Sequence, residues 1–485
     1  MNARLARAMV VIAAFVAAMP VPSLVAQEKP DRTVAPALAA APNVTLPSID
    51  RRLLSNGVRV WLVEAHEVPL VQVNLVITAG SGDDSPGRYG LASLTSAMLD
   101  EGAGARSALE LADELEFLGA NLATTSSFDS SAVRLNVPVS RLAAALPVMA
   151  DVALRPTFPQ AELDRVRQER ITALLQSRDD AAAVVPPAFA RVVFGPTHRY
   201  GTAAVGTEGT LTELTVADLR GFHAAMYRPG NATLIVVGDV TAATMMPMLE
   251  RAFGGWQAAG GAMPRVAVPA APQLTSAQVH IVDMPGAAQS QIRIGWVGVP
   301  RVTPDDFPLQ VLNTILGGSF TSRLNQNLRE AHGYSYGAFS RFDMRLSAGS
   351  FFAGAGVQTD KTAESLREFF NELRRIRQPV EVEELAKAKN YVALGFPSEL
   401  ETIGDLSAHL EDLVVYSLPD TYYDTYVAAI QHVTAAAVRH VAERYIQPER
   451  FAVVVVGDRK VIEPGIRALN LGPVRITSVQ EVMGP

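Results

Sequence analysis

Hydrophobic and polar positions in the first part of the chain predict a β-sheet with helices. Asn56-Gly57 separates two apolar runs, which is a strong signal for a short β-hairpin. Apolar and polar residues then alternate at 71–77 and 132–137, and each run predicts one strand. Apolar residues at helical spacing predict four helices, at 90–99, 108–118, 141–153 and 161–175. This mixture favours an α+β domain with an antiparallel sheet.

The pattern of the first half recurs in the second half. A helix followed by a buried strand that ends in Val-Val-Gly-Asp occupies residues 217–239. The same design returns at 437–458, where Val-Val-Gly-Asp stands 219 positions later. A Glu-Leu pair that opens a helix after a proline recurs 222 positions later, at 162–163 and 384–385. Two separate landmarks with nearly equal offsets indicate an internal duplication.

The duplication divides the chain into two domains. We predict an N-terminal domain at residues 49–253, a Gly-, Ala- and Pro-rich linker at 254–273, and a C-terminal domain at 274–470. Within the second domain, strands are predicted at 280–282 and 291–298, and helices at 307–316 and 361–376. The predicted fold class is α+β, with two duplicated domains that each consist of an antiparallel β-sheet covered by α-helices.

The composition is ordinary and excludes several kinds of chemistry. The 485 residues are 48% hydrophobic and 19% charged, with a formal net charge of −7. Since no run of Lys or Arg occurs, the chain lacks the basic patch typical of nucleic-acid binding, and we expect no nucleic-acid partner. The absence of cysteine rules out disulfides, Cys-ligated zinc and thiol catalysis.

The N-terminus has the three parts of a secretory signal peptide. Two arginines precede a 12-residue apolar run at 8–19, and Leu-Val-Ala at 24–26 offers a cleavage site. The apolar run is shorter than the roughly 20 residues that span a bilayer. We predict a signal peptide at residues 1–26, a flexible tether at 27–48, export to the periplasm, and no membrane span after signal cleavage.

The helix predicted at 90–99 has small residues where catalytic ones could stand. Ser93, Ser96 and Ala97 are at positions i, i+3 and i+4, which lie on one side of a helix. Inverzincins carry His, Glu and His at this spacing, as two zinc ligands and a general base. The three residues of this chain can neither bind zinc nor accept a proton at neutral pH.

The rest of the sequence offers no familiar substitute for such a site. None of the eight histidines lies four positions from another, so a helical His pair cannot hold zinc. Serine-hydrolase elbows, Ser-x-x-Lys, dinucleotide loops and Walker loops are absent. These residues by themselves indicate a binding or partner protein, although a metal site built from distant histidines remains open.

Five stretches of the chain resemble the pitrilysin/insulinase family of zinc peptidases. They are Leu54-Ser-Asn-Gly-Val-Arg-Val, residues 80–99, Phe194-Gly-Pro-Thr-His-Arg-Tyr-Gly, residues 211–239, and residues 316–336, which contain Leu-Gly-Gly-Ser-Phe-Thr-Ser-Arg-Leu and Leu-Arg-Glu-Ala-His-Gly-Tyr-Ser-Tyr. The chain is most similar to the bacterial two-subunit type and to mitochondrial processing peptidase.

The resemblance implies that the metal site of the family is lost here. The family's catalytic helix reads His-x-x-Glu-His, where this sequence has Ser93, Ser96 and Ala97. The family also has two glutamates seven positions apart on a later helix, the second being a zinc ligand. This sequence keeps the first as Glu169 and has Gln176 in place of the second. We predict that Glu169 is an ion-paired helix residue and that this chain holds no metal or other cofactor.

The resemblance also implies two residues that act on a bound peptide. In this family an Arg, and a Tyr seven residues later, reach the substrate from the C-terminal domain, and Arg329 and Tyr336 match them. Arg can hold a peptide carbonyl or carboxylate, and Tyr can donate to a developing oxyanion. The alternative is that Arg329 is solvated and Tyr336 lies in the core. Tyr334 is predicted to pack and His332 to lie at the surface.

Residues 119–128 resemble the edge strand to which a substrate adds as an extra strand in this family. Their small polar side chains would leave the backbone accessible. An ordinary exposed strand is the alternative.

Together these features predict a catalytically silent subunit of a heterodimeric, exported zinc metallopeptidase. The partner would be a homologous subunit that carries the zinc, and peptides or unfolded proteins would be the substrates. Arg329 and Tyr336 would be supplied to the partner's site. The alternative is a structural or scaffolding member of the family with no part in hydrolysis.

Overall fold

The structure is a computed structural model that describes residues 44–257 and 268–483. The predicted signal peptide at 1–26, residues 27–43 of the predicted tether and residues 258–267 of the predicted linker lie outside the described residues. All described residues belong to a single unit that contains two six-stranded sheets. No helix in these ranges is long and apolar enough to cross a bilayer.

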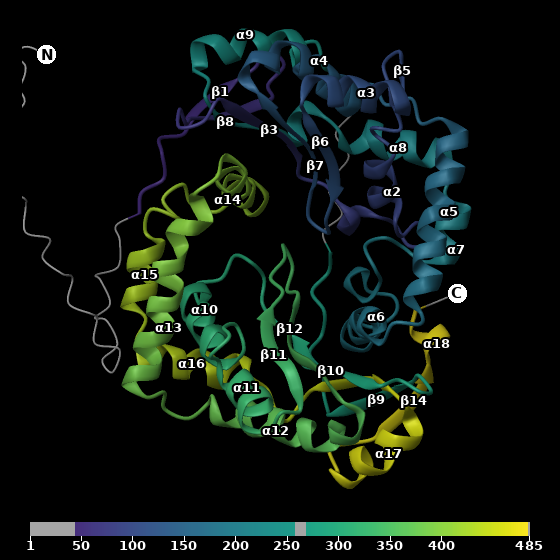
Figure 1. The fold of residues 1–485 in the computed structure, drawn as a ribbon, viewed down its shortest axis with the longest axis vertical. Coiled ribbons are helices and arrows are strands. Elements are labelled where there is room, and N and C mark those ends of the chain that lie inside the picture. The colour runs from purple at the N-terminus through teal and green to yellow at the C-terminus, as the bar shows by residue number, and fades with distance from the viewer. Residues whose placement is uncertain (1–43, 258–267, 484–485) are drawn as a thin grey trace, which may run out of the picture. The chain divides into compact units, whose positions relative to one another are not determined.

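The first sheet is built from the N-terminal half, in the order β1-β2-β8-β3-β7-β6 (Figure 1). Its strands are β1 (Asp50–Leu53), β2 (Arg59–Glu64), β3 (Leu70–Ile77), β6 (Asn121–Ser126), β7 (Ser131–Pro138) and β8 (Ala232–Gly238). β1 and β2 pair antiparallel on either side of Asn56-Gly57, so the predicted hairpin is confirmed. A separate small ribbon pairs β4 (Gly102–Ala103) with β5 (Arg106–Ser107).

The second sheet is built from the C-terminal half, in the order β11-β12-β10-β13-β9-β14. Its strands are β9 (Gln278–Asp283), β10 (Gln289–Val297), β11 (Ser335–Phe342), β12 (Ser350–Gln358), β13 (Ala452–Gly457) and β14 (Val474–Ser478). Every residue of β13 is buried, as is every residue of β8 in the first sheet.

The repeated sequence landmarks take equivalent places in the two sheets. β8 lies between β2 and β3, whereas β13 lies between β9 and β10. Each follows a helix, α8 (Val216–Met226) or α16 (Ala435–Tyr445). The two Glu-Leu pairs both lie in the first turn of a helix, α5 (Gln160–Ser177) or α13 (Val382–Gly395). The predicted duplicated α+β fold is therefore confirmed.

The sheets are mixed and not antiparallel throughout, which corrects the prediction. β2 pairs parallel with β8, and β9 pairs parallel with both β13 and β14. The remaining pairs are antiparallel. A strand buried on both faces reads as a continuous apolar run, and such a run carries no information about the direction of its neighbours. The chain between β2 and β8 supplies the crossover that a parallel pair requires.

Helices cover the sheets, and those predicted from the sequence form. The remaining helices are α2 (Leu91–Ala97), α3 (Ala108–Leu118), α4 (Leu142–Leu154), α6 (Ala181–Phe194), α7 (Glu208–Glu213), α9 (Ala242–Phe253), α10 (Asp306–Leu316), α11 (Arg323–Asn325), α12 (Thr362–Arg375), α14 (Ile403–Tyr416), α15 (Tyr426–His432), α17 (Arg459–Ala468) and α18 (Val479–Met483).

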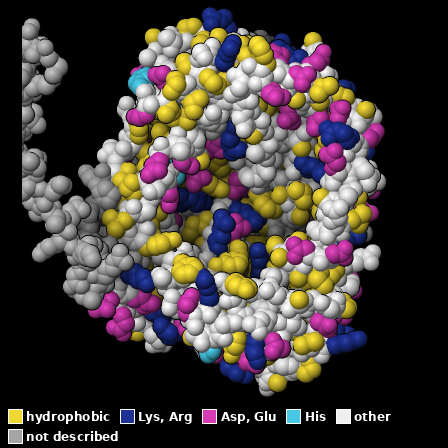
Figure 2. All heavy atoms as spheres, in the orientation of Figure 1, with side chains coloured by type: hydrophobic (Ala, Val, Ile, Leu, Met, Phe, Trp, Pro, Cys, Tyr) yellow, Lys and Arg dark blue, Asp and Glu magenta, His cyan; other side chains and the backbone are white. Residues whose placement is uncertain are grey.

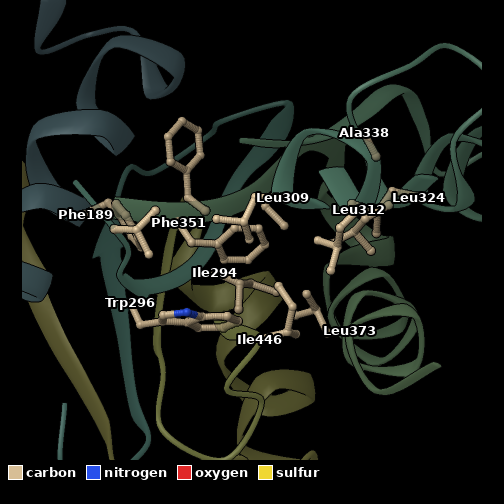
Figure 3. Close-up of a cluster of buried hydrophobic side chains, with 14 of the residues drawn as sticks. Phe189, Ile294, Trp296, Leu309, Leu312, Leu324, Ala338, Phe351, Leu373 and Ile446 are labelled. Atoms are coloured by element: carbon tan, nitrogen blue, oxygen red, sulfur yellow. The ribbon is translucent and has the colours of Figure 1, made fainter. Parts of the chain in front are cut away.

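The core of the second half includes large side chains from neighbouring strands. Trp296 on β10 and Phe351 on β12 lie with ring centroids 4.7 Å apart, beside Ile294 (Figure 3). The Trp296 Nε1 donates a hydrogen bond to the backbone oxygen of Tyr445 at 2.7 Å. Successive residues of a strand point to opposite faces, so Phe352 lies on the other face of the sheet. There α6, which belongs to the predicted first domain, packs Phe189 against it, with ring centroids 6.0 Å apart.

Helix α14 joins the second half to the first sheet. It packs against β3 and β8 (Figure 1). Glu411 on α14 accepts hydrogen bonds from the Nε and Nη2 atoms of Arg134 on β7, at 2.8 and 2.5 Å. The same carboxylate accepts a third hydrogen bond from the Nδ2 of Asn74 on β3, at 2.6 Å. One carboxylate therefore links α14 to two strands of the other half.

Candidate functional site

Helix α2, where the family's catalytic residues would stand, is held at its N-terminus by a buried carboxylate. Asp84 accepts hydrogen bonds from the backbone N–H groups of Gly90 and Ala92, both at 2.9 Å, and from Arg199 Nη2 at 3.0 Å. Burial, opposed by the charge of Arg199, raises the pKa of Asp84 to about 6. Gly90 has a φ of 97°, and a Cβ at this position would lie 2.6 Å from the backbone oxygen of Val205. Only glycine fits there.

The three small residues of α2 contribute no metal-binding group. Ser96 is buried, whereas Ser93 and Ala97 are half-buried. Across residues 44–257 and 268–483, no group of three or more His, Cys, Asp or Glu side chains could hold a metal ion.

Arg170 on α5 reaches α2, a contact that was not predicted from the sequence. Its Nη1 donates to Ser93 Oγ at 3.0 Å, and its Nη2 donates to the Ser93 backbone oxygen at 2.9 Å. No described carboxylate forms an ion pair with this guanidinium, and burial lowers its pKa. Leu163, Val166 and Arg170 are spaced i, i+3 and i+7, so the helical period placed Arg170 on the buried face of α5. This helical spacing could have predicted from the sequence that Arg170 faces the interior.

The two positions that the resemblance assigns to glutamates are both exposed and make no hydrogen bond to α2 among the described residues. Glu169 is an exposed residue whose carboxylate pairs with Arg165 Nη1 at 2.8 Å, as predicted. Gln176 is exposed in the last turn of α5. Arg170, and not Gln176, is therefore the residue that makes the hydrogen bonds between α5 and α2.

Arg329 and Tyr336 lie on two elements of the second half that are in contact. Arg329 is in the π-helical turn η5 (Gln326–Ala331), and Tyr336 is near the start of the edge strand β11. The guanidinium of Arg329 lies over the ring of Phe320, 4.3 Å from its centroid, and within 3.5 Å of Glu330. Tyr336 is 90% exposed, so the alternative that it lies in the core is excluded.

The neighbours of this pair behave as predicted from the sequence. His332 is exposed, and its ring stacks on the half-buried ring of Tyr334 with centroids 4.9 Å apart. No hydrogen bond or ion pair among the described residues connects Arg329 or Tyr336 with α2. Tyr336 is almost fully exposed and the Arg329 side chain is 34% exposed, so both have surface that a bound molecule can contact.

Strand β6 forms one edge of the first sheet. It pairs antiparallel with β7 along its length, and no other strand of the described residues flanks it. Its small side chains, Ala123, Thr124 and Thr125 among them, are exposed or half-buried. The prediction of an edge strand at 119–128 is confirmed, and such an edge can accept an added strand through backbone hydrogen bonds.

Two family models match this chain, one in each half. Residues 59–190 match the model described as insulinase (peptidase family M16), and residues 213–392 match the model described as the peptidase M16 inactive domain. The chain is a member of the peptidase M16 (insulinase) family. The resemblance stated from the sequence motifs is thereby confirmed.

Relatives of this M16 protein are named as zinc proteases. It is 24% identical to an uncharacterized zinc protease of Streptomyces coelicolor over 85% of this chain and 90% of the relative. It is 25% identical to the uncharacterized zinc protease YmxG of Bacillus subtilis over 67% of this chain and 79% of the relative.

Solved structures share the fold of this M16 protein. A peptidase M16 inactive domain from Pseudomonas fluorescens superposes with a TM-score of 0.78, at 24% identity over 84% of this chain and 98% of that one. The first half of the periplasmic protease PqqL from Escherichia coli gives a TM-score of 0.70, at 18% identity over 91% and 98%. The full-length PqqL chain is covered over 51% of its length.

The relatives are named for zinc, but α2 of this M16 protein offers no ligand for a zinc ion. Zinc in proteins is bound by imidazole, thiolate or carboxylate groups, and Ser93, Ser96 and Ala97 provide none of them. The group that reaches α2 from α5 is the cation of Arg170, which repels a second cation. No chemical step that uses a metal on this helix can therefore be derived.

Proposed function

We propose that this M16 protein is a catalytically silent subunit that binds extended peptides and acts with a homologous, zinc-bearing peptidase subunit. The observation that carries the proposal is the state of α2, where serine and alanine replace every metal-binding group and Arg170 contacts Ser93. A chain without a metal ligand or a general base on this helix cannot activate water there. We also propose that the chain is exported, in keeping with the N-terminal sequence and with a periplasmic structural relative.

Peptide binding is supported by the edge strand β6 and by the exposed pair in the second half. An extended peptide can pair with the free edge of β6 through its backbone. Arg329 can donate to a peptide carbonyl or carboxylate, and the accessible hydroxyl of Tyr336 can donate to an oxygen that gains charge. In the proposed complex these two side chains act on a peptide held at the partner's site.

A second homologous unit is supported by the length of one relative. The full-length PqqL chain contains about twice as much sequence as the region that matches this protein. A separate subunit of the same fold would supply the other half of such an arrangement. This is the reason to propose a heterodimer.

The first experiment measures metal content and peptidase activity of the purified chain. We expect no stoichiometric zinc and no cleavage of unfolded casein by the chain alone. A metal-loaded and active preparation would refute the proposal. The zinc-bearing homologue encoded nearest to this gene is then co-expressed, and the complex is purified through a tag on this chain.

The second experiment tests the exposed pair in that complex. Arg329→Ala and Tyr336→Phe should each lower turnover by about 10²–10³-fold, the usual effect of losing a donor to a developing oxyanion. Tyr391→Phe and Arg439→Ala, which change exposed residues on other helices, serve as matched controls and should leave turnover unchanged. Unchanged turnover of the first two variants in an intact complex would favour a scaffolding role.

A further inference from the structure

A cavity of about 450 Å³ lies between α6 and the second sheet, apart from α2, Arg329 and Tyr336. Aromatic rings form much of its wall, including Phe189, Phe194, Tyr200 and Phe352. The rings of Phe194 and Tyr200 meet edge to face, with centroids 5.7 Å apart. Ligand sites in proteins commonly occupy about 300–1,000 Å³ and combine apolar walls with a few polar groups. This cavity has that form.

The charged residues that line the cavity are mostly arginines. They are Arg191, Arg293, Arg341, Arg345 and Asp343. Asp343 accepts a hydrogen bond from Arg345 Nη2 at 2.5 Å, so the single carboxylate is already paired. The Nη1 of Arg345 is buried and has no hydrogen-bond partner among the described residues. An excess of positive charge therefore faces the cavity.

The register of the second sheet places two of these arginines on one face. Arg293 on β10 is paired with Gly354, and Arg341 on β11 is paired with Phe352. Gly354 and Phe352 are two positions apart on β12, so all four residues share a face of the sheet. The guanidinium of Arg293 lies over the ring of Phe352, 4.4 Å from its centroid.

Among the described residues, neither the Arg293 nor the Arg341 guanidinium forms an ion pair with a carboxylate, although the charge of Asp343 acts on Arg293. No hydrogen bond or ion pair joins either guanidinium to a described side chain, although both line the cavity. Burial outweighs the attraction of Asp343 and, together with the charge of Arg341, lowers the pKa of Arg293 to about 10, so the group stays charged at neutral pH. Figure 2 shows Lys and Arg side chains beside apolar and acidic ones within the hollowed middle of one face of the molecule.

We infer that this cavity binds a carboxylate of the peptide, and that the protein therefore prefers acidic peptides. The inference rests on the proposed peptide binding. A guanidinium presents a planar pair of donors that matches a carboxylate, and such charge-assisted hydrogen bonds are about twice as strong as neutral ones. Aromatic walls exclude water and strengthen the attraction, and they also accommodate the apolar part of the bound segment.

The test compares three short fluorescein-labelled peptides by fluorescence polarisation with the purified chain. The first is an Ala/Ser/Leu peptide with three Glu residues and an amidated C-terminus. The second replaces each Glu by Gln, and the third is the Gln peptide with a free C-terminal carboxylate. The protein variants are Arg293→Gln, Arg341→Gln and the two combined. Arg439→Gln on α16, an exposed residue in an i,i+4 ion pair, is the matched control.

We expect the Glu peptide to bind at least about tenfold more tightly than its Gln counterpart, because each carboxylate can accept charge-assisted hydrogen bonds. The combined variant should remove this difference and leave binding of the Gln peptide unchanged, whereas Arg439→Gln should preserve it. If the third peptide binds more tightly than the amidated Gln peptide, the cavity recognises a C-terminal carboxylate. This result would also support the inference.

Two negative results have different meanings. Equal binding of all three peptides by the unmodified chain would overturn the carboxylate site and leave the proposed peptide binding intact. Failure of every peptide to bind would overturn the proposed peptide binding together with this inference. Circular dichroism of each variant establishes that it is folded. If charge causes the preference for the Glu peptide, rising salt should reduce that preference in the unmodified chain, as the combined variant does.

Discussion

The contact between α14 and the first sheet gives the sharpest stability prediction. Glu411→Gln keeps the shape of the side chain but removes its charge and turns one acceptor oxygen into a donor. Arg134 and Asn74 together offer three hydrogens to the native carboxylate. In the variant at least one of these donors faces an NH2 group and loses its partner.

The expected magnitude follows from how far the pair is exposed. Loss of one partner from a fully buried ion pair costs about 3–5 kcal/mol, whereas an exposed pair contributes about 0–1 kcal/mol. The Glu411 side chain is 12% exposed, but that of Arg134 is 33% exposed and can recover some hydration. We therefore expect the free energy of unfolding to fall by about 1.5–2.5 kcal/mol.

The assay is urea unfolding followed by circular dichroism, with hydrogen exchange of peptides from α14, β3 and β7. Exchange should accelerate in these three elements because the link between the two halves is weakened. The matched control is Glu443→Gln, which changes an exposed i,i+4 partner of Arg439 and should cost less than about 0.5 kcal/mol. Equal effects of the two substitutions would show that Glu411 contributes no more to stability than an exposed ion pair.

Three further predictions concern other parts of the molecule. The triple variant Ser93→His, Ser96→Glu, Ala97→His should still take up no stoichiometric zinc in a metal assay, because the Arg170 guanidinium can still donate to the backbone oxygen of residue 93 and repels a second cation; one bound equivalent would contradict this. Trp296→Ala should lower the free energy of unfolding by about 3–5 kcal/mol in urea, through loss of a buried indole. Burial lowers the pKa of His223 below 6.5, so the stability that its neutral ring contributes is full above that pH and is lost as the pH falls. The urea midpoint should therefore differ less between about pH 7.5 and about pH 5.5 in His223→Gln than in the unmodified chain.

Much of the fold could be predicted because its signals are local. The Asn56-Gly57 turn, the alternating strands and the amphipathic helices each depend on residues close in sequence, and the two Val-Val-Gly-Asp strands revealed the duplication. The direction of neighbouring strands was not predictable in the same way. β8 and β13 are buried on both faces, and an apolar run of this kind is compatible with parallel and antiparallel neighbours.

That α2 carries no metal ligand follows from the sequence alone, because the identity of Ser93, Ser96 and Ala97 settles which atoms are present. Family membership follows from the sequence too, through motifs spread over both halves. Three-dimensional packing, in contrast, brings Arg170 to Ser93, joins the two halves through Glu411, and lines one cavity with arginines from α6 and two strands. These contacts join residues far apart in sequence, and their formation depends on how sheets and helices pack, which local periodicity does not encode.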